Sequence, residues 1–195
     1  RKQTGLMIKI GLTGGIGCGK TYVSDLIVSK GVPVYNSDTE AKKIMASDAG
    51  VIESLERLIG ENIIVNGMLD RSLITRFVFS DKQNARAVDD IVHPKVKSDF
   101  LNWADSLVTD VCVIESAILI ESGFCDLVDF LVVVDAPLDV RIKRCMIRDD
   151  VGPDMIMDRI AMQMDQKEKC LKADFVIDNS GNVDLIPQIE MMLEK

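Results

Sequence analysis

The sequence predicts an α/β protein built on a five-stranded parallel sheet. Strand-like and helix-like segments alternate along the chain, which is typical of parallel sheets joined by helices. The runs at 111–114 and 130–134 are continuously apolar, as in central strands that helices cover on both faces. The other three expected strands are 7–12, 32–35 and 175–177.

Composition limits the classes of function. The chain has 195 residues, of which 47% are hydrophobic and 28% charged, a balance that fits a globular unit with a substantial core. The formal net charge of −8 argues against a surface for nucleic acid or acidic membranes. Residues 1–5 are expected to lead directly into the first strand and not into a secretion signal. Five cysteines without C-x-x-C spacing predict reduced thiols and a cytoplasmic location, without zinc.

A glycine-rich segment follows the first strand. Residues 14–21 read Gly-Gly-Ile-Gly-Cys-Gly-Lys-Thr and match the pattern G-x-x-x-x-G-K-[ST] at every fixed position. Glycines allow successive N–H groups to turn toward phosphate oxygens. Lys20 can reach the outer phosphates, and the Thr21 hydroxyl can ligate Mg²⁺. The segment therefore predicts nucleotide binding, with a simple strand-to-helix turn as the alternative.

Two acidic residues are expected at the edge of the sheet where that loop lies. Asp38 follows the second strand and Glu115 follows the strand at 111–114, and ligands of parallel sheets bind beyond these carboxyl ends. Asp38 can serve as general base toward an acceptor hydroxyl, but an aspartate before Thr39 also suits a helix N-cap. Glu115 can hold Mg²⁺ through water or be a solvated residue.

The chain between the second and third strands is expected to be mostly helical. Helix starts are predicted at Asp48, Asp70 and Asp81, and Asn66-Gly67 predicts a turn. A helix that begins at Pro94 would give the block its own packing face. The apolar stripe of this helix consists of Val96, Phe100, Trp103 and Leu107. A last helix is expected from 182–184, with Pro187 in its first turn.

A predicted helix around 141–148 carries three arginines on one face: Arg141, Arg144 and Arg148. Guanidinium groups bind phosphate bidentately and stabilise charge on a transferring phosphoryl group. The segment 149–153 would end the helix and allow a hinge, as in a lid over a nucleotide. The alternative is a surface helix with intrahelical ion pairs.

Two reactive side chains have ordinary explanations. His93, the only histidine, is interpreted as a structural residue before a helix that starts at Pro94, with a catalytic base as the alternative. Cys18 is interpreted as a packing residue, although the positive charge of Lys20 can lower its pKa and make it sensitive to oxidants.

The chain resembles the dephospho-coenzyme A kinase family. The matching segments, in this order, are residues 10–20, 31–34, Asp38, 69–71, Phe79, 91–94, 119–123, 144–149, Gln163 and 173–181. They span almost the whole chain, and their succession is more specific than the phosphate loop alone. Three positions depart from the family: Tyr22 where a second Ser or Thr is usual, Asn36 where Asp is common, and Ala117 in place of a proline.

The resemblance implies an ATP-dependent phosphotransferase with an alcohol acceptor. Its reaction would transfer the γ-phosphate of ATP to the ribose 3′-hydroxyl of 3′-dephospho-coenzyme A, giving coenzyme A and ADP in the last step of coenzyme A synthesis. The implied architecture is a P-loop nucleotide-kinase-like three-layer fold within one unit, 1–195. Its parts would be a core at 7–46 and 109–195, a helical substrate domain at 47–108, and a lid at 141–165.

The resemblance also implies site residues. The catalytic residues carried over by position are Asp38, Lys20 and Arg148. The residues expected to bind ATP are Gly15, Ile16, Gly17, Cys18, Gly19, Lys20, Thr21 and Tyr22 at the phosphates, with Asn179 and Gly181 near the adenine. Thr21 would ligate Mg²⁺, and Arg71 with His93-Pro94 would lie on the substrate side. The expected partner is 3′-dephospho-coenzyme A, without nucleic acid or membrane, and the expected state is a monomer or weak oligomer.

Two other classes of protein are weighed against this function. One is another small-molecule or nucleoside monophosphate kinase on the same core. The other is a nucleotide-dependent switch without enzymatic activity, but no N-K-x-D guanine signature occurs in the sequence.

Overall fold

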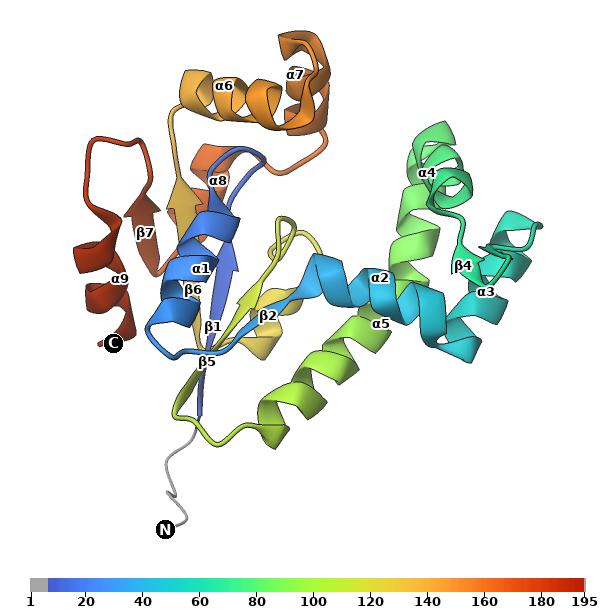
Figure 1. The fold of residues 1–195 in the computed structure, drawn as a ribbon, viewed down its shortest axis with the longest axis horizontal. Coiled ribbons are helices and arrows are strands. Elements are labelled where there is room, and N and C mark those ends of the chain that lie inside the picture. The colour runs from blue at the N-terminus through green and yellow to red at the C-terminus, as the bar shows by residue number, and fades with distance from the viewer. Residues whose placement is uncertain (1–6, 195) are drawn as a thin grey trace. The chain divides into compact units, whose positions relative to one another are not determined.

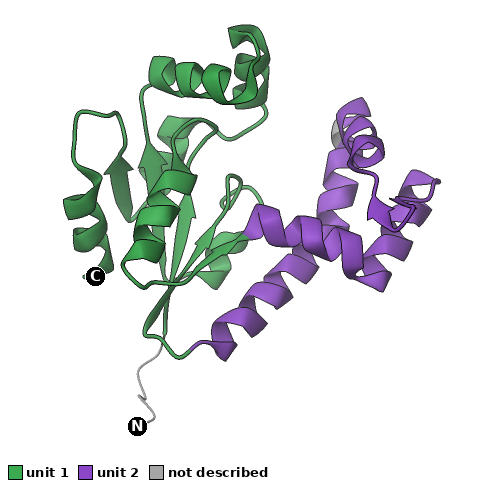
Figure 2. Ribbon diagram, viewed as in Figure 1, with its two compact units in different colours: residues 1–36, 108–195 green, residues 37–107 purple. Residues whose placement is uncertain are grey.

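The structure is a computed structural model that describes residues 7–194, with Lys82 described by its backbone only. It divides into two compact units, one with the chain up to Asn36 and from Val108 onward, the other Ser37–Leu107 (Figure 2). The sequence-based boundary of the helical block is residue 47, and the functions assigned to the parts stay predictions. The expectation for residues 1–5 lies outside the described residues.

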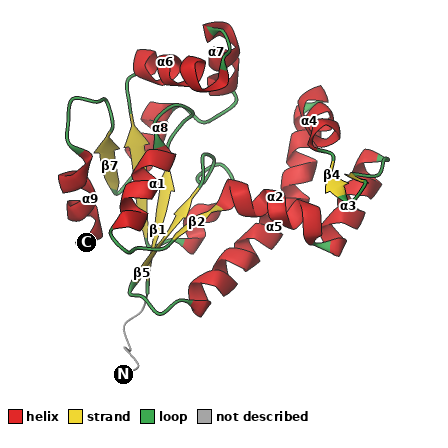
Figure 3. Ribbon diagram, viewed as in Figure 1, coloured by secondary structure: helices red, strands yellow, loops and turns green. Residues whose placement is uncertain are grey.

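The first unit contains a five-stranded parallel sheet in the order β2-β5-β1-β6-β7 (Figure 3). Leu12 of the central strand is level with Glu115 on one side and Val132 on the other. The strands are β1 (Ile8–Thr13), β2 (Val34–Asn36), β5 (Val111–Glu115), β6 (Phe130–Asp135) and β7 (Phe175–Asp178). All five predicted strands are present, and the predicted fold class is confirmed.

Helices cover this sheet and extend beyond its carboxyl edge. They are α1 (Lys20–Ser29), α6 (Leu138–Asp149), α7 (Pro153–Ala161), α8 (Gln166–Lys172) and α9 (Leu185–Leu193), with a 3₁₀ helix η1 (Phe124–Leu127). Figure 1 shows α6 and α7 beyond the end of β6, while α1 and α9 contact each other beside the sheet. The side chain of Asp184 caps α9 by accepting from the Ile186 N–H at 3.0 Å, which confirms the predicted start with Pro187 in the first turn.

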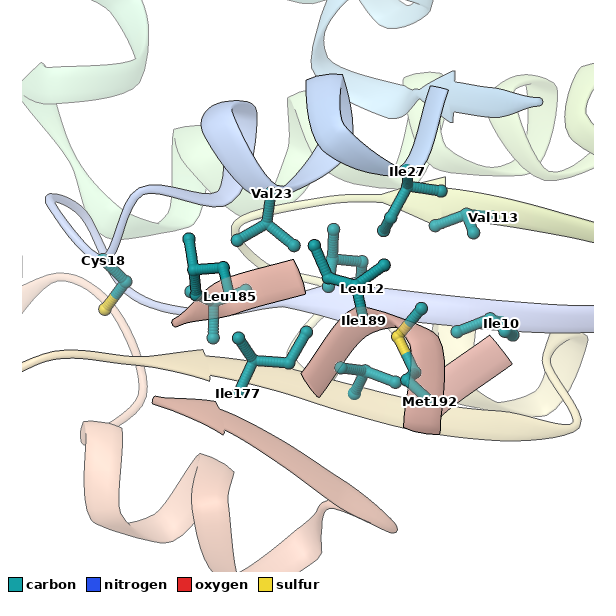
Figure 4. Packing of buried hydrophobic residues seen from close by; sticks show 12 residues of the cluster. Ile10, Leu12, Cys18, Val23, Ile27, Val113, Ile177, Leu185, Ile189 and Met192 are labelled. Atoms are coloured by element: carbon teal, nitrogen blue, oxygen red, sulfur yellow. The ribbon is translucent and has the colours of Figure 1, made fainter. Parts of the chain in front are cut away.

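The core of this unit lies between the sheet and the pair α1 and α9 (Figure 4). Val23 and Ile27 of α1 meet Ile189 and Met192 of α9 over Leu12 of β1, and none of these five is more than 1% exposed. Each such side chain contributes about 1.5–3 kcal/mol by its burial. This packing fixes the start of α1 relative to the end of β1, and therefore the loop between them.

The second unit consists of helices and one short hairpin. Its elements are α2 (Ser37–Ser47), α3 (Ala49–Ile59), β3 (Ile64–Val65), β4 (Met68–Leu69), α4 (Arg71–Ser80) and α5 (Lys82–Ser106). The carboxylates of Asp48, Asp70 and Asp81 each accept backbone N–H groups at the start of α3, α4 and α5. The three predicted helix starts are therefore confirmed. Asn66 and Gly67, both with positive φ, form the turn between β3 and β4.

The predicted helix start at Pro94 is wrong, because α5 runs through this residue. A proline inside a helix removes one backbone hydrogen bond and normally breaks or kinks it. Here the buried stripe continues on both sides of the proline with a spacing of four, through Val88, Val92, Val96 and Phe100. Packing of this stripe against the other helices of the unit outweighs the local rule. His93 therefore lies inside a helix and not before one.

Within residues 7–194, no helix has the length and apolar character needed to cross a bilayer.

Candidate active site

The glycine-rich loop joins β1 to α1 at the carboxyl edge of the sheet. Gly17 has a φ of +81°, a left-handed conformation that favours glycine. A Cβ on Gly17 would also lie 2.5 Å from the backbone oxygen of Arg141. Both the backbone angle and the tight packing therefore require glycine at this position.

The loop carries hydrogen-bond donors at the N-terminus of α1. Gly19, with a φ of +86°, is the N-cap of α1, and no side chain caps the helix. Within the described residues, the N–H groups of Gly17 and Gly19 have no hydrogen-bond partner. The Lys20 ammonium donates to the Gly14 oxygen at 2.8 Å. Uncapped N–H groups at a helix start, together with an ammonium group, form an anion-binding arrangement.

Thr21 and Tyr22 follow Lys20 in the first turn of α1. The Tyr22 side chain is exposed. Among the described residues, no group of three or more His, Cys, Asp and Glu side chains is arranged to hold a metal ion. The Mg²⁺ ligation expected of the Thr21 hydroxyl stays a prediction.

Side chains from the second half of the chain hold the backbone of the loop. The buried Arg141 donates through Nε to the Ile16 oxygen at 3.0 Å. Asn179 Nδ2 donates to the Cys18 oxygen at 2.7 Å. The side chain predicted to lie near adenine is thus used on the loop, and the adenine contact of Asn179 and Gly181 stays a prediction.

Two glutamines at the loop were not assigned a role from the sequence. Gln166 accepts the Gly15 N–H and Gln163 accepts the Ile16 N–H, both at 2.9 Å. Gln163 has only its place in the family pattern as a signal, and Gln166 has none. The N–H groups of two residues predicted to bind ATP are therefore bound to protein oxygens.

The three arginines of α6 have different surroundings. Arg144 approaches the loop, since its Nη1 lies 3.8 Å from the position of a Cβ on Gly19. This Nη1 is buried and lacks a hydrogen-bond partner among residues 7–194. Arg148 is 62% exposed at its side chain and donates to both carboxylate oxygens of Asp149, at 2.7 and 3.0 Å. These bonds hold the pKa of the Asp149 carboxyl below its ordinary value. Arg144 and Arg148 thus share a helix but not an environment.

The two predicted acidic residues are in defined places. Asp38 lies in the first turn of α2, which begins at Ser37, so the alternative that it precedes the helix as a cap is wrong. Its catalytic role stays a prediction. Glu115 is 5% exposed and accepts from Asn36 Nδ2 at 2.5 Å. The alternative that Glu115 is a solvated residue is therefore wrong.

Burial affects the pKa values of His93, which is partly buried, and of Cys18. Burial lowers the pKa of His93, more than the nearby Asp89 carboxylate raises it. Cys18 is fully buried, and this burial raises the pKa of its thiol despite the opposing charges of Arg141 and Lys20. The expected lowering of the Cys18 pKa by Lys20 is therefore wrong, while the interpretation of Cys18 as a packing residue agrees with its burial.

Comparison with known proteins gives one family. The family model described as Dephospho-CoA kinase matches residues 8–184. A dephospho-CoA kinase of Bacteroides fragilis is 46% identical over 185 residues, with 94% of this chain and 90% of the relative covered. The corresponding protein of Porphyromonas gingivalis is 39% identical, with 96% and 94% covered.

Solved structures share the fold, and one of them is a dephospho-CoA kinase. The crystal structure of TT1252 from Thermus thermophilus has a TM-score of 0.85 at 31% identity, with 96% of both chains covered. Dephospho-CoA kinase from Campylobacter jejuni has a TM-score of 0.71 at 25% identity, with 97% of this chain and 96% of that chain covered. A shikimate kinase from Bacteroides thetaiotaomicron, at a TM-score of 0.51 and 15% identity, shares the fold.

Proposed function

This chain belongs to the dephospho-CoA kinase family, and from this membership we propose which of its residues perform the reaction. The reaction is transfer of the γ-phosphoryl group of ATP to the ribose 3′-hydroxyl of dephospho-CoA, which gives CoA and ADP. The observation that carries the function is the family match over residues 8–184. The uncapped loop at the start of α1 supports it, because it offers donors that fit a polyphosphate.

We assign the phosphate donors to the second half of the loop and the first turn of α1. The N–H groups of Gly17 and Gly19, which lack partners among the described residues, would bind phosphate oxygens with those of Thr21 and Tyr22. Lys20 would exchange the Gly14 oxygen for the outer phosphates. Gly15, Ile16 and Cys18, which are also predicted to bind ATP, would then give the loop its shape and would not donate their N–H groups to phosphate.

The arginines of α6 would complete the donor side. The buried Nη1 of Arg144, which has no partner among the described residues, supports a direct bond to a phosphate oxygen, which would supply the missing acceptor. Arg148 remains the proposed lid arginine on the transferring group, and it must leave Asp149 to take this role. Arginine suits both tasks, because its planar donors match phosphate geometry and stabilise developing charge.

Asp38 is the proposed general base. It would accept the proton of the 3′-hydroxyl as that oxygen bonds to the γ-phosphorus, while the bond to the β–γ bridging oxygen breaks and ADP leaves. Its place directly after β2, in the first turn of α2, supports this role, since ligands of parallel sheets bind at the carboxyl ends of the strands.

We propose that the Thr21 hydroxyl holds Mg²⁺ with the nucleotide, and that Glu115 does so through water. When bound, this ion neutralises charge on the phosphates. The burial of Glu115 at the carboxyl end of β5 supports its part.

We also propose a cytoplasmic monomer or weak oligomer that has no nucleic-acid partner. The metabolic family supports this location. A cytoplasmic location also agrees with the five cysteines, which form no disulfide in the described part of the chain.

The proposed function is tested by measuring ADP release with dephospho-CoA, AMP and shikimate offered separately. We expect turnover only with dephospho-CoA, and a product heavier by one phosphate group. Shikimate is the sharpest comparison, because a shikimate kinase shares the fold. Turnover with AMP or shikimate alone would contradict the assignment and favour another small-molecule kinase.

A further inference from the structure

We infer that Gln163 and Gln166 are positioning residues for ATP, since their side-chain oxygens hold the first half of the phosphate loop in the shape that receives the nucleotide. Gln166 Oε1 accepts the Gly15 N–H and Gln163 Oε1 accepts the Ile16 N–H, both at 2.9 Å. Gln163 lies between α7 and α8, and Gln166 is the first residue of α8. We call this pair the glutamine clamp; its role rests on the proposed ATP site.

Gln166 is fixed at both ends of its carboxamide. Its Nε2 donates to the Val134 oxygen and to Asp135 Oδ1, each at 3.0 Å, at the end of β6. The oxygen is therefore directed at Gly15 and cannot rotate away without loss of both bonds. A glutamate would lack the donor end and would place a like charge beside Asp135.

Gln163 is held through its backbone and its neighbour. Its N–H donates to the Ile160 oxygen at 3.1 Å and closes the end of α7. The next residue, Met164, donates its N–H to Glu121 Oε1 at 2.9 Å. Glu121 in turn pairs with the fully buried Lys169 of α8 at 2.8 Å. The segment that presents Gln163 is thus anchored independently of the loop.

Gly15 provides a separate observation in favour of the clamp. Unlike Gly17 and Gly19, Gly15 does not have a positive φ, so its backbone angles do not call for glycine. A Cβ at this position would lie 3.0 Å from Gln166 Oε1 and even closer to the Arg141 guanidinium. The missing side chain therefore makes room for the groups that hold the loop.

The clamp divides the N–H groups of the loop into two sets. Those of Gly15 and Ile16 are bound to neutral oxygens of the protein, while those of Gly17 and Gly19 remain for phosphate. A neutral oxygen binds the amide without repelling the phosphate charge, as a carboxylate would. A loop ordered beforehand spares ATP the free energy of ordering it. Without the clamp, a smaller fraction of molecules would have the binding-competent loop, and the apparent Kd for ATP would rise in proportion.

The substitutions Gln163→Met and Gln166→Met remove the oxygens and keep the side-chain length. The matched control is Gln188→Met, since Gln188 Oε1 also accepts a backbone N–H, that of Asp178 at 2.8 Å, outside the loop. We expect each clamp variant to raise the KM for ATP and the Kd for a non-hydrolysable ATP analogue by about 10-fold, the effect of one lost hydrogen bond. We expect kcat and the KM for dephospho-CoA to change by less than about 2-fold, because the clamp does not act in the transfer step.

Amide exchange measured by NMR tests the contacts directly. Exchange of the Gly15 N–H should accelerate in Gln166→Met, and exchange of the Ile16 N–H in Gln163→Met, with neither affected in Gln188→Met. A general loss of stability would accelerate both together. An unchanged Kd for the ATP analogue, or a rise equal to that of Gln188→Met, would overturn the positioning role. Should Gln166→Met fail to fold, Gln163→Met, which removes one hydrogen bond, decides the question alone.

Failure of the clamp and failure of the proposed function are separable. Analogue binding and amide exchange need no acceptor substrate. If the wild-type protein does not phosphorylate dephospho-CoA but both clamp variants still bind the ATP analogue more weakly, the proposed substrate is wrong and the clamp stands. If dephospho-CoA is phosphorylated and analogue binding is unaffected in both variants, the clamp is wrong and the substrate stands.

Discussion

Replacing Arg144 by methionine tests whether its guanidinium is kept for the nucleotide. Nη1 of Arg144 is buried, has no hydrogen-bond partner in the part of the chain that the structure describes, and lies beside Gly19 at the start of α1. A hydrogen bond to a charged group contributes about 1.5–3 kcal/mol, which corresponds to about 10- to 150-fold in an equilibrium constant. We therefore expect Arg144→Met to raise the KM for ATP by about 10- to 150-fold.

Although Arg144→Met should weaken ATP binding, it should not lower the stability of the ligand-free protein. A buried donor without an acceptor is unfavourable in the ligand-free protein, so its removal should leave the unfolding temperature unchanged or raise it by up to about 4 °C. Most substitutions that weaken ligand binding by disturbing the fold would lower this temperature. The combination of weaker ATP binding and undiminished stability is therefore specific to a guanidinium held for phosphate.

The assay combines steady-state kinetics with thermal unfolding in the absence of nucleotide. Lys143→Met is the matched control, because it removes a positive charge from an exposed position of the same helix. An ATP KM in Arg144→Met no higher than in Lys143→Met would refute the reasoning. So would an unfolding temperature several degrees below that of the wild type, which would identify Arg144 as a structural residue.

Four further substitutions test the rest of the site and its support. Asp38→Asn should leave ATP binding nearly intact and lower turnover by at least ~10²-fold; near-normal turnover would exclude Asp38 as the base. Arg148→Lys should lower turnover through lost bidentate geometry, and an unaffected rate would make Arg148 a surface residue. Glu121→Ala leaves the fully buried Lys169 without its carboxylate and should destabilise the protein by about 3–5 kcal/mol, measured by denaturant unfolding; a loss below about 1 kcal/mol would contradict the importance of this pair. Because burial lowers the pKa of His93 from its ordinary value of 6.5, the unfolded chain binds more protons, and this residue's contribution to the free energy of unfolding is lost as the pH falls through 6.5. His93→Gln should make the free energy of unfolding less dependent on pH between about pH 7.5 and 5.5. An equal pH dependence in the variant and the wild type would argue against this effect of His93.

The features that could be predicted from the sequence are those with a local cause. The loop at 14–21 is recognisable from the fixed residues of its motif, which lie between a predicted strand and a predicted helix. Asp48, Asp70 and Asp81 were recognisable because a cap acts on N–H groups two or three residues away. In each case the residues that determine the structure are neighbours in the chain.

The features that could not be predicted depend on distant residues. Gln166 meets Gly15 across 151 positions of sequence, and no periodicity encodes such a contact. The direction of the Cys18 pKa shift was mispredicted for the same reason, since the charge of Lys20 is visible in the sequence but the burial that outweighs it is not. Pro94 shows the limit of local rules, because the stripe on either side of it packs well enough to retain the helix.

The cationic groups at the loop differ in what they must give up to bind ATP. Arg141 is committed through Nε to the Ile16 oxygen, so it adds positive charge while that donor stays with the loop. Lys20 donates to the Gly14 oxygen, and ATP binding gains only the difference between that bond and a charge-assisted bond to phosphate. Arg144 Nη1 has no hydrogen bond to another described residue that it would have to exchange. The free energy of a hydrogen bond from Nη1 to a phosphate oxygen is therefore not reduced by the loss of such a bond within the protein. In a protein of net charge −8, we expect affinity for the polyphosphate to depend more on this single nitrogen than on the number of basic residues on α6.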